Sequence, residues 1–326
     1  MCSSDLMDFP EPPISLYRAM RTLNPSPYIW FNGELVAWEK AQVHVLTHAL
    51  HYASSVFEGI RAYKRAGGET TIFRLRDHIE RLFDSCRLVH ITPRPSIEDV
   101  ERACVDVVRA NGMEDAYIRP LVFVGEGAMG IYAPENPIRT SVIAWRWGAY
   151  LGAEALERGI RVRISSWARH HLSVSLAKGK IMGQYTNSTL AKREAKFGGY
   201  DEAIMLDSSG YVSEGTGENI FVVKNGVVRT PPTSAAILAG ITRDTAIQLL
   251  RERGVEVREE MIARDELYTA DEVFLTGTAA EITPVREIDH RKIGRGEWPI
   301  TFGVQDAFFQ IVKGSDAKHD HWLHFV

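Results

Sequence analysis

Segments with strand-like and helix-like patterns follow one another in this chain without a regular order. Two Asn-Gly pairs, Asn32-Gly33 and Asn225-Gly226, each lie between stretches of alternating apolar residues, a pattern typical of β-hairpins with type I′ turns. Other stretches carry apolar residues at helical spacing, and ITRDTAIQLLRERG is the clearest of them. Because the strands and helices do not alternate as repeated βαβ units, the sequence predicts an α+β (mixed α/β) fold rather than a doubly wound sheet.

The first half of the chain carries several further signals. A short helix is expected over 14–21 and a strand around 56–63. The segment TTIFRLRDHIERLFDSCRLVHI becomes helical, and a second helix is expected over 96–111 with Ser96 as its N-cap. AYIRPLVFVG and TSVIAWRWGAY then alternate like strands.

In the second half, strands are expected in IRVRISSWARH, DEAIMLD, VEVREEMI and ADEVFLTGT, and helices in STLAKREAKFGGY and WPITFGVQDAFFQIVKG. The segment 148–159 is bounded by glycines and is the best candidate for a domain boundary. We therefore expect four parts: an N-terminal extension (1–27), a small N-terminal α/β domain (28–150), an interdomain connector (151–158) and a large C-terminal domain (159–326).

The composition argues against several classes of protein. A net charge of −4 indicates no basic surface for nucleic acid, and no apolar run approaches the length of a membrane span. We expect no signal peptide. The three cysteines, Cys2, Cys86 and Cys104, are too scattered for a disulfide framework or a Cys-based zinc site, which favours a cytoplasmic protein. We expect the histidine-rich tail, KHDHWLHFV, to be solvated, and we assign no metal site.

Four local clusters contain residue types suited to chemistry. LAKGKIMGQYTNS surrounds Lys180 with small residues, although a lone lysine in a loop is usually solvated. YVSEGTGENIFVV holds two glutamates and an asparagine between glycines, which is also typical of a plain turn. ILAGITRDT places a glycine before a helix, where free N–H groups attract phosphate. FLTGTAAEITPV ends a strand in Thr-Gly-Thr, which offers donors to an anion or simply forms a turn.

Taken together and in this order, the clusters resemble the branched-chain amino-acid aminotransferases, which are pyridoxal-phosphate enzymes of fold type IV. The resemblance begins at YIWFNGELVAWEKAQVHVLTHALHYASSVFEGIRAY, continues through AYIRPLVFVG, AWRWGAYLGAEALERGI, SEGTGENIFVV and AGITRD, and ends at LYTADEVFLTGTAAEITPVREID. It implies two domains with pyridoxal 5′-phosphate at their interface. The implied reaction is transamination between Leu, Ile or Val and 2-oxoglutarate, giving branched-chain 2-oxo acids and L-glutamate by a ping-pong mechanism through pyridoxal and pyridoxamine phosphate.

The family's Lys-x-x-Gly-x-Tyr element, which holds the Schiff-base lysine, corresponds here to the residues from Lys180 to Tyr185. Ile-Met and Gln stand where the family most often has Ala-Gly and Asn, so the spacing carries the match. Lys178 is a rival, but only Lys180 keeps the spacing to Gly183 and Tyr185. The resemblance implies that Lys180 attaches the cofactor and moves the proton between the substrate Cα and the cofactor C4′.

The remaining cofactor contacts also follow from the resemblance. Glu214 would keep the pyridine nitrogen protonated, Tyr185 would hydrogen-bond the 3′-oxygen, and Leu238 would pack against the ring. The phosphate would be held by Arg81, by the N–H of Ile241, by Thr242 and by Thr278. For Glu218 and Asn219 we expect only a role in shaping the loop after Glu214.

The substrate pocket must accept an apolar side chain and the second carboxylate of glutamate in turn. The resemblance implies the following contacts: Tyr117, Thr278 and Ala279 for the α-carboxylate; Arg119, with Tyr52 and Tyr150 nearby, for the second carboxylate; and Phe57, Trp147 and Ile131 for the apolar side chain. Ile131 would reach across from a neighbouring subunit, so at least a homodimer is expected. Ordinary core packing is the alternative explanation for these aromatic residues.

Other functions remain open at this level. A D-amino-acid aminotransferase, an (R)-amine aminotransferase or an aminodeoxychorismate lyase of the same fold would keep Lys180, Glu214 and the phosphate loops. AYIRPL and TGTAAEI favour the branched-chain enzymes over these three. A non-catalytic binding protein of this fold is a different class of alternative, and the presence of both Lys180 and Glu214 argues against it.

Overall fold

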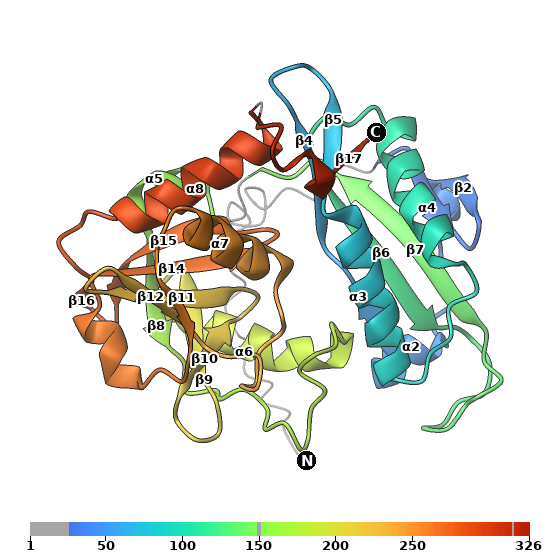
Figure 1. Cartoon of the computed structure of the whole chain (residues 1–326). Coiled ribbons are helices and arrows are strands. Elements are labelled where there is room, and N and C mark those ends of the chain that lie inside the picture. Colours follow the sequence, from blue (N-terminus) through green and yellow to red (C-terminus); the bar gives the residue numbers. More distant parts are fainter. Residues whose placement is uncertain (1–25, 149–150, 315) are drawn as a thin grey trace, which may run out of the picture.

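The computed structural model describes residues 26–148, 151–314 and 316–326. The expected helix at 14–21, Cys2 and Tyr150 lie outside this part of the chain. Within it the strands form two sheets, each covered by helices, in two halves that lie side by side (Figure 1). The arrangement is α+β, as the sequence predicts.

The first sheet has the strand order β17-β5-β4-β6-β7-β1-β2, with β3 paired to β6. Its strands are β1 (Tyr28–Phe31), β2 (Glu34–Ala37), β3 (Ser55–Phe57), β4 (Ile60–Lys64), β5 (Thr70–Phe73), β6 (Ala116–Val124), β7 (Ile138–Trp145) and β17 (Leu323–Phe325). The helices of this half are η1 (Trp38–Lys40), α2 (His48–Tyr52), α3 (Leu75–Leu88) and α4 (Ile97–Ala110).

The second sheet has the order β10-β9-β8-β15-β14-β11-β12-β13, with β16 paired to β15. Its strands are β8 (Ile160–Ile164), β9 (Glu202–Leu206), β10 (Val212–Gly215), β11 (Asn219–Lys224), β12 (Val227–Thr230), β13 (Val257–Glu259), β14 (Glu272–Gly277), β15 (Glu281–Ile288) and β16 (Arg291–Lys292). Its helices are α5 (Ala153–Arg158), η2 (Met182–Gln184), α6 (Tyr185–Phe197), α7 (Ile241–Glu252), η3 (Arg264–Thr269), α8 (Pro299–Val312) and η4 (Asp320–Trp322).

Local chemistry explains the element boundaries. Asn32 and Asn225 have φ values of 51° and 52°, and the glycine after each also has a positive φ, as a type I′ turn requires. Ser96 caps α4 in a capping box with Asp99, as the sequence predicts. The strand expected around 56–63 is interrupted, however, because β3 ends at Phe57 and β4 begins at Ile60. Glu58 and Gly59 fill the gap, and this break places a carboxylate in the site described below.

Apolar packing holds each half together and joins the two halves. In the first, Ile79 and Leu82 of α3 are fully buried in one cluster with residues of α4 and the sheet. A second cluster crosses between the halves: Phe73 of β5 meets Phe308 of α8 edge-on, with ring centroids 5.4 Å apart. Each half therefore limits the movement of the other.

The C-terminal segment contradicts our expectation of a solvated tail. β17 pairs with β5, so the last strand belongs to the first sheet, whereas the expected division assigned all residues after 158 to one domain. His319 is buried, its Nδ1 donates to Oδ2 of Asp316 at 2.8 Å, and its ring stacks on Trp322. Strand pairing and this aromatic contact outweigh the polar composition of the segment. The domain boundaries as a whole stay a prediction.

Two absences apply to residues 26–148, 151–314 and 316–326. No helix there is both long enough and apolar enough to cross a membrane. Nor is there any group of three or more His, Cys, Asp or Glu side chains arranged to hold a metal ion.

Replacing Trp322 with Ala tests whether the C-terminal segment is a structural part of the fold. Trp322 is 8% exposed and its ring lies 6.2 Å from that of Phe73. We expect the free energy of unfolding, measured with urea, to fall by about 3 kcal/mol. Trp167→Ala is the control, because Trp167 is 44% exposed. Equal effects of the two substitutions would contradict a structural role for this segment.

Candidate active site

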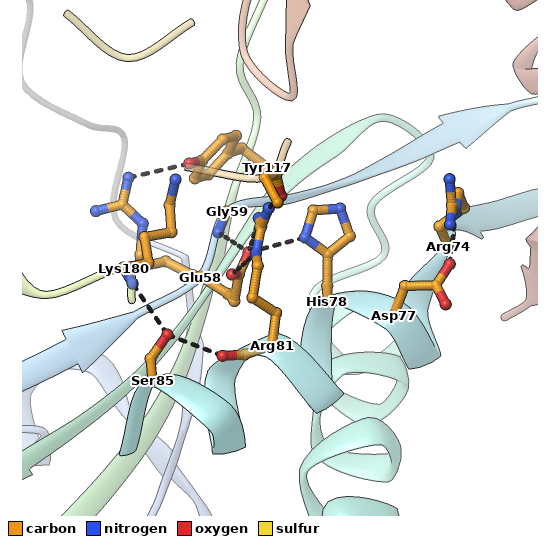
Figure 2. Close-up of polar contacts among 11 residues, drawn as sticks. Glu58, Gly59, Arg74, Asp77, His78, Arg81, Ser85, Tyr117 and Lys180 are labelled. Atoms are coloured by element: carbon orange, nitrogen blue, oxygen red, sulfur yellow. Dashed lines mark hydrogen bonds and ion pairs between the residues drawn. The ribbon is translucent and has the colours of Figure 1, made fainter. Parts of the chain in front are cut away.

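A buried carboxylate in the break between β3 and β4 binds two side chains of α3. Arg81 donates from Nε to Oε1 of Glu58 at 2.7 Å and from Nη2 to Oε2 at 2.9 Å, and His78 Nδ1 lies 2.8 Å from Oε2 (Figure 2). The third nitrogen of the Arg81 guanidinium, Nη1, donates to the carbonyl of Ala239 at 2.8 Å. Burial raises the pKa of Glu58, but the charge of Arg81 and the hydrogen bonds outweigh it and hold that pKa well below its usual range. Arg81 is therefore fixed in direction and is not the solvent-facing arginine that a helix usually presents.

Lys180 is tied to the first half of the molecule by its own backbone. Its N–H donates to Ser85 Oγ of α3 at 2.9 Å (Figure 2). Its carbonyl accepts from the N–H of Phe57 at 3.1 Å. Its Nζ lies 5.2 Å from the ring centroid of Phe57 and 5.7 Å from that of Tyr185. Burial lowers the pKa of this ammonium, but Tyr185 and Glu58 raise it by more, so the net shift is upward.

Lys178, the rival lysine, has a different environment. Its Nζ donates to the carbonyls of Ala235 at 3.1 Å, Ile237 at 3.0 Å and Thr233. Burial lowers the pKa of this ammonium, while the charge of Glu214 opposes that shift. All three N–H bonds of a protonated amine are used here, so Lys178 is poorly suited to act as a nucleophile.

Glu214, at the end of β10, is buried and held by three donors. Its Oε2 accepts from Asn219 Nδ2 at 3.1 Å and from the N–H of Leu238 at 3.2 Å. Its Oε1 accepts from Arg169 Nη2. With three donors on it, the carboxylate is a fixed negative charge facing the same cavity as Lys180.

One cavity brings together all eight residues that we expected to contact the cofactor: Arg81, Lys180, Tyr185, Glu214, Leu238, Ile241, Thr242 and Thr278. They come from seven separate elements or loops. Arg81 lies at one side with the first turn of α7, whose N-cap, Gly240, supplies no side-chain cap to the helix. The arginine charge, the helix dipole and the threonine hydroxyls together suit a phosphate group.

The cavity wall is also made of glycines and of a threonine without a partner. Gly217, Gly240 and Gly277 line it, and glycines let a ligand approach the backbone closely. The hydroxyl of Thr276 is buried and, among the described residues, has no hydrogen-bond partner. An oxygen-rich ligand in this cavity would satisfy it.

An aromatic group surrounds Arg119 beside Lys180. The Arg119 guanidinium lies 4.6 Å from the ring centroid of Phe57 and 5.1 Å from that of Tyr117, and its Nη2 donates to the Tyr117 hydroxyl at 3.1 Å. Trp147 packs edge-on against Tyr117 at 4.6 Å. A Cβ at position 59 would meet the Tyr117 hydroxyl at 1.9 Å, so a glycine is required there for Tyr117 to lie as it does.

The remaining residues expected at the substrate do not belong to the aromatic group around Arg119. Thr278 lines the cavity and Ala279 follows it in the same loop, half-buried. Tyr52 is 45% exposed, with its ring near those of His48 and His51, and Ile131 is 90% exposed. Neither of these two lines the cavity around Lys180 within one chain.

Three residues of the site were not assigned from the sequence: Glu58, Ser85 and Arg169. The glutamate carried a signal, because a charged residue followed by glycine interrupts an apolar strand pattern. Ser85 and Arg169 carried none, since their roles depend on contacts with residues 95 and 45 positions away. Asn219, for which only a loop-shaping role was expected, donates directly to Glu214.

Comparison with known proteins agrees with this geometry. The family model for amino-transferase class IV matches residues 55–288. A branched-chain-amino-acid aminotransferase of Pseudomonas aeruginosa is 50% identical over 299 residues, which cover 91% of this chain and 97% of that protein. The enzyme of the same name from Escherichia coli (strain K12) is 49% identical over 304 residues, covering 93% and 98%.

Solved structures show the same relationship. The crystal structure of the Escherichia coli branched-chain amino acid aminotransferase superposes with a TM-score of 0.89 at 48% identity, covering 91% of this chain and 98% of that one. A second branched-chain amino acid aminotransferase, solved with pyridoxamine 5′-phosphate, gives 0.88 at 44% identity, covering 92% and 98%. The fold is therefore that of the fold type IV aminotransferases. The chain belongs to the class IV aminotransferase family, which confirms the resemblance drawn from the sequence.

The buried carboxyl of Glu218, near Glu214, makes the stability of the protein depend on pH. Burial, with the nearby charge of Glu202, raises the pKa of Glu218 to about 8, although Lys192 and the N–H of Gly217 oppose the shift. Between the ordinary pKa of 4.5 and about 8, the folded state then binds one more proton than the unfolded state. Stability contributed by this group is present below pH 4.5 and is lost as the pH rises through that window.

Replacing Glu218 with Gln removes this titration while keeping the shape of the side chain. We expect the melting temperature of the variant, relative to that of the original chain, to rise progressively from pH 5 to about 8.5. Calorimetry at four or five pH values measures the difference. A difference that does not change with pH would show that Glu218 is ionised in the folded protein.

Proposed function

We propose that the chain transfers the amino group of branched-chain L-amino acids to 2-oxoglutarate, with pyridoxal 5′-phosphate attached to Lys180. The observation that carries the proposal is the single cavity in which Lys180, Glu214 and the phosphate-binding groups converge. Similarity to structures with pyridoxamine 5′-phosphate and with N-(5′-phosphopyridoxyl)-L-glutamate supports the choice of cofactor.

The donor set fits this cofactor. Arg81, the first turn of α7 with Thr242, and Thr278 would hold the phosphate. At the other end Glu214 would pair with the ring nitrogen, Tyr185 would donate to the 3′-oxygen, and Leu238 would cover one face of the ring. When bound, the cofactor supplies an electron sink for the bond broken at the substrate Cα.

Lys180 would hold the cofactor and carry the proton to and from the substrate Cα. Its Nζ lies near the rings of Phe57 and Tyr185 and, among the described residues, forms no ion pair, so the amine can move between these two tasks. Its backbone bonds to Ser85 and Phe57 would keep its Cα fixed while the side chain moves.

The group around Arg119 would serve two kinds of substrate in turn. Behind the rings of Phe57 and Tyr117, the guanidinium leaves an apolar wall for a branched side chain. Turned outward, the same guanidinium would pair with the second carboxylate of glutamate. Tyr117 and the N–H groups of Thr278 and Ala279 would hold the α-carboxylate, and Trp147 would contact the side chain.

We also propose that the chain acts in the cytoplasm as at least a homodimer. An apolar groove is lined by Phe31, Val43, Leu50 and Met182, and Ile131 is almost fully exposed. A second copy covering this face would bury these side chains and bring Ile131 and Tyr52 towards a substrate pocket. Sedimentation velocity tests this: we expect a species of twice the chain mass or more, which Leu50→Asp dissociates. A monomer at micromolar concentration would contradict the proposal.

A panel of amino donors with 2-oxoglutarate tests the proposed reaction. We expect rapid formation of glutamate from leucine, isoleucine and valine, and turnover of D-alanine and (R)-amines slower by about a hundredfold or more. D-alanine presents the opposite hand to the α-carboxylate contacts, and (R)-amines lack the α-carboxylate altogether. Lys180→Ala is the control and should reduce turnover by at least a thousandfold. Fast turnover of D-alanine without turnover of leucine would overturn the substrate assignment, and an active Lys180→Ala variant would overturn the assignment of the lysine.

A further inference from the structure

The ammonium of Lys178 fills a nest of backbone carbonyls close to the proposed cofactor site. The three carbonyls belong to Thr233, Ala235 and Ile237, in the loop between β12 and α7. The loop has other anchors as well: Ser213 Oγ donates to the carbonyl of Ala236 at 2.9 Å, and Arg243 Nη2 donates to that of Pro231 at 2.8 Å. Lys178 nevertheless binds three of the five carbonyls from 233 to 237 with one positive charge.

One peptide group connects this nest to Glu214. The carbonyl of Ile237 accepts from Lys178 Nζ at 3.0 Å, and the N–H of the same peptide, that of Leu238, donates to Glu214 Oε2 at 3.2 Å. The cation therefore binds one end of an amide whose other end binds the carboxylate. Such an arrangement polarises the amide and strengthens both hydrogen bonds.

A second link closes the arrangement on the other side of Leu238. Asn219 Nδ2 donates both to the carbonyl of Leu238 at 2.9 Å and to Glu214 Oε2 at 3.1 Å. Leu238 is thus held on both sides. Its N–H donates to Glu214, and its carbonyl accepts from Asn219, which also donates to Glu214. Displacing the loop would move Leu238 and loosen Glu214 together.

We propose that Lys178 is a positioning residue that fixes Leu238 and orients Glu214 through the Ile237–Leu238 peptide. The inference rests on the proposed function, in which Leu238 covers the cofactor ring and Glu214 pairs with its nitrogen. Lys178 acts at a distance through the amide and does not itself touch the cofactor. The two lysines of the AKGK segment then divide the work: Lys180 reacts, and Lys178 holds the opposite side of the ring in place.

Three variants test the proposal on the full-length protein. Lys178→Met removes the charge and the three donors while keeping the length of the side chain. Lys178→Arg keeps the charge, but its planar fork cannot direct three N–H groups onto one converging nest. Lys224→Met is the matched control, because Lys224 Nζ also donates to a backbone carbonyl, that of Thr269, but lies outside the cavity.

The measurements are the dissociation constant for pyridoxal 5′-phosphate, obtained by absorbance titration of the cofactor-free protein, and the pH midpoint of the bound cofactor's absorbance change. For Lys178→Met we expect about tenfold weaker binding, since lost hydrogen bonds to a charged group are of that size. We also expect a higher pH midpoint, because a nearby positive charge is lost. Lys178→Arg should bind more weakly than the original chain but keep the original midpoint, and Lys224→Met should change neither value.

The outcomes separate this inference from the proposed function. If Lys178→Met binds the cofactor within twofold of Lys224→Met and has the same pH midpoint, Lys178 is not a positioning residue, and the proposed function stands. Lowered thermal stability of Lys178→Met with an unchanged midpoint would mean a purely structural role and would also overturn the inference. If the original chain itself fails to bind the cofactor, the proposed function fails first. Should Lys178→Met not fold, the cofactor affinity of Lys178→Arg decides, and an affinity equal to that of the original chain counts against the proposal.

Discussion

The backbone of Lys180 is hydrogen-bonded on both sides to the other half of the molecule, and the geometry of the site depends on these two bonds. Ser85 of α3 accepts from its N–H and the N–H of Phe57 donates to its carbonyl. The Ser85 hydroxyl in turn donates to the carbonyl of Arg81 at 2.8 Å. One hydroxyl thus links the backbones of the lysine and the arginine, both of which line the cavity. The apolar cluster that crosses between the halves keeps this junction closed.

Around the cavity, the buried carboxylates of Glu58 and Glu214 are each paired with an arginine. Glu58 neutralises Arg81 and fixes its direction, while Arg169 and the Leu238 peptide compensate Glu214. Unpaired charges in such a place would be costly, so pairing is what allows several of them to lie together. Lys180 differs from these groups, because its amine faces aromatic rings rather than a carboxylate. The Lys180 amine is therefore suited to react, whereas the paired arginines and glutamates are suited to hold a ligand in place.

The fold class could be predicted because it depends on local pattern. The eight residues expected at the cofactor came from the family resemblance, which depends on the order of motifs, and the structure places all eight along one cavity. The lysine element, the glutamate loop and the two phosphate loops are short, and their spacing within each segment survives in the fold. Glu58, Ser85 and Arg169 were missed because a pairing between residues far apart in the chain leaves no periodic trace. Glu58 also lies in the break that divides the strand expected around 56–63 into β3 and β4.

Two other differences have the same origin. The C-terminal segment has the composition of a solvated tail, yet β17 completes the first sheet because a free strand edge of β5 lies beside it. Tyr52 and Ile131 were expected at the substrate, and within one chain both are exposed. Under the proposed homodimer, a second copy of the chain would bring both side chains to the substrate. The roles of the individual site residues remain proposals that rest on this geometry.

The most direct test of the account is to locate the cofactor on the chain. The holoenzyme is reduced with borohydride, digested, and its peptides are examined by mass spectrometry for the phosphopyridoxyl group. Because Lys178 is held by three carbonyls and the Lys180 amine faces the cavity, we predict the label on Lys180 alone. A label on Lys178, or on a lysine outside the cavity, would contradict the account.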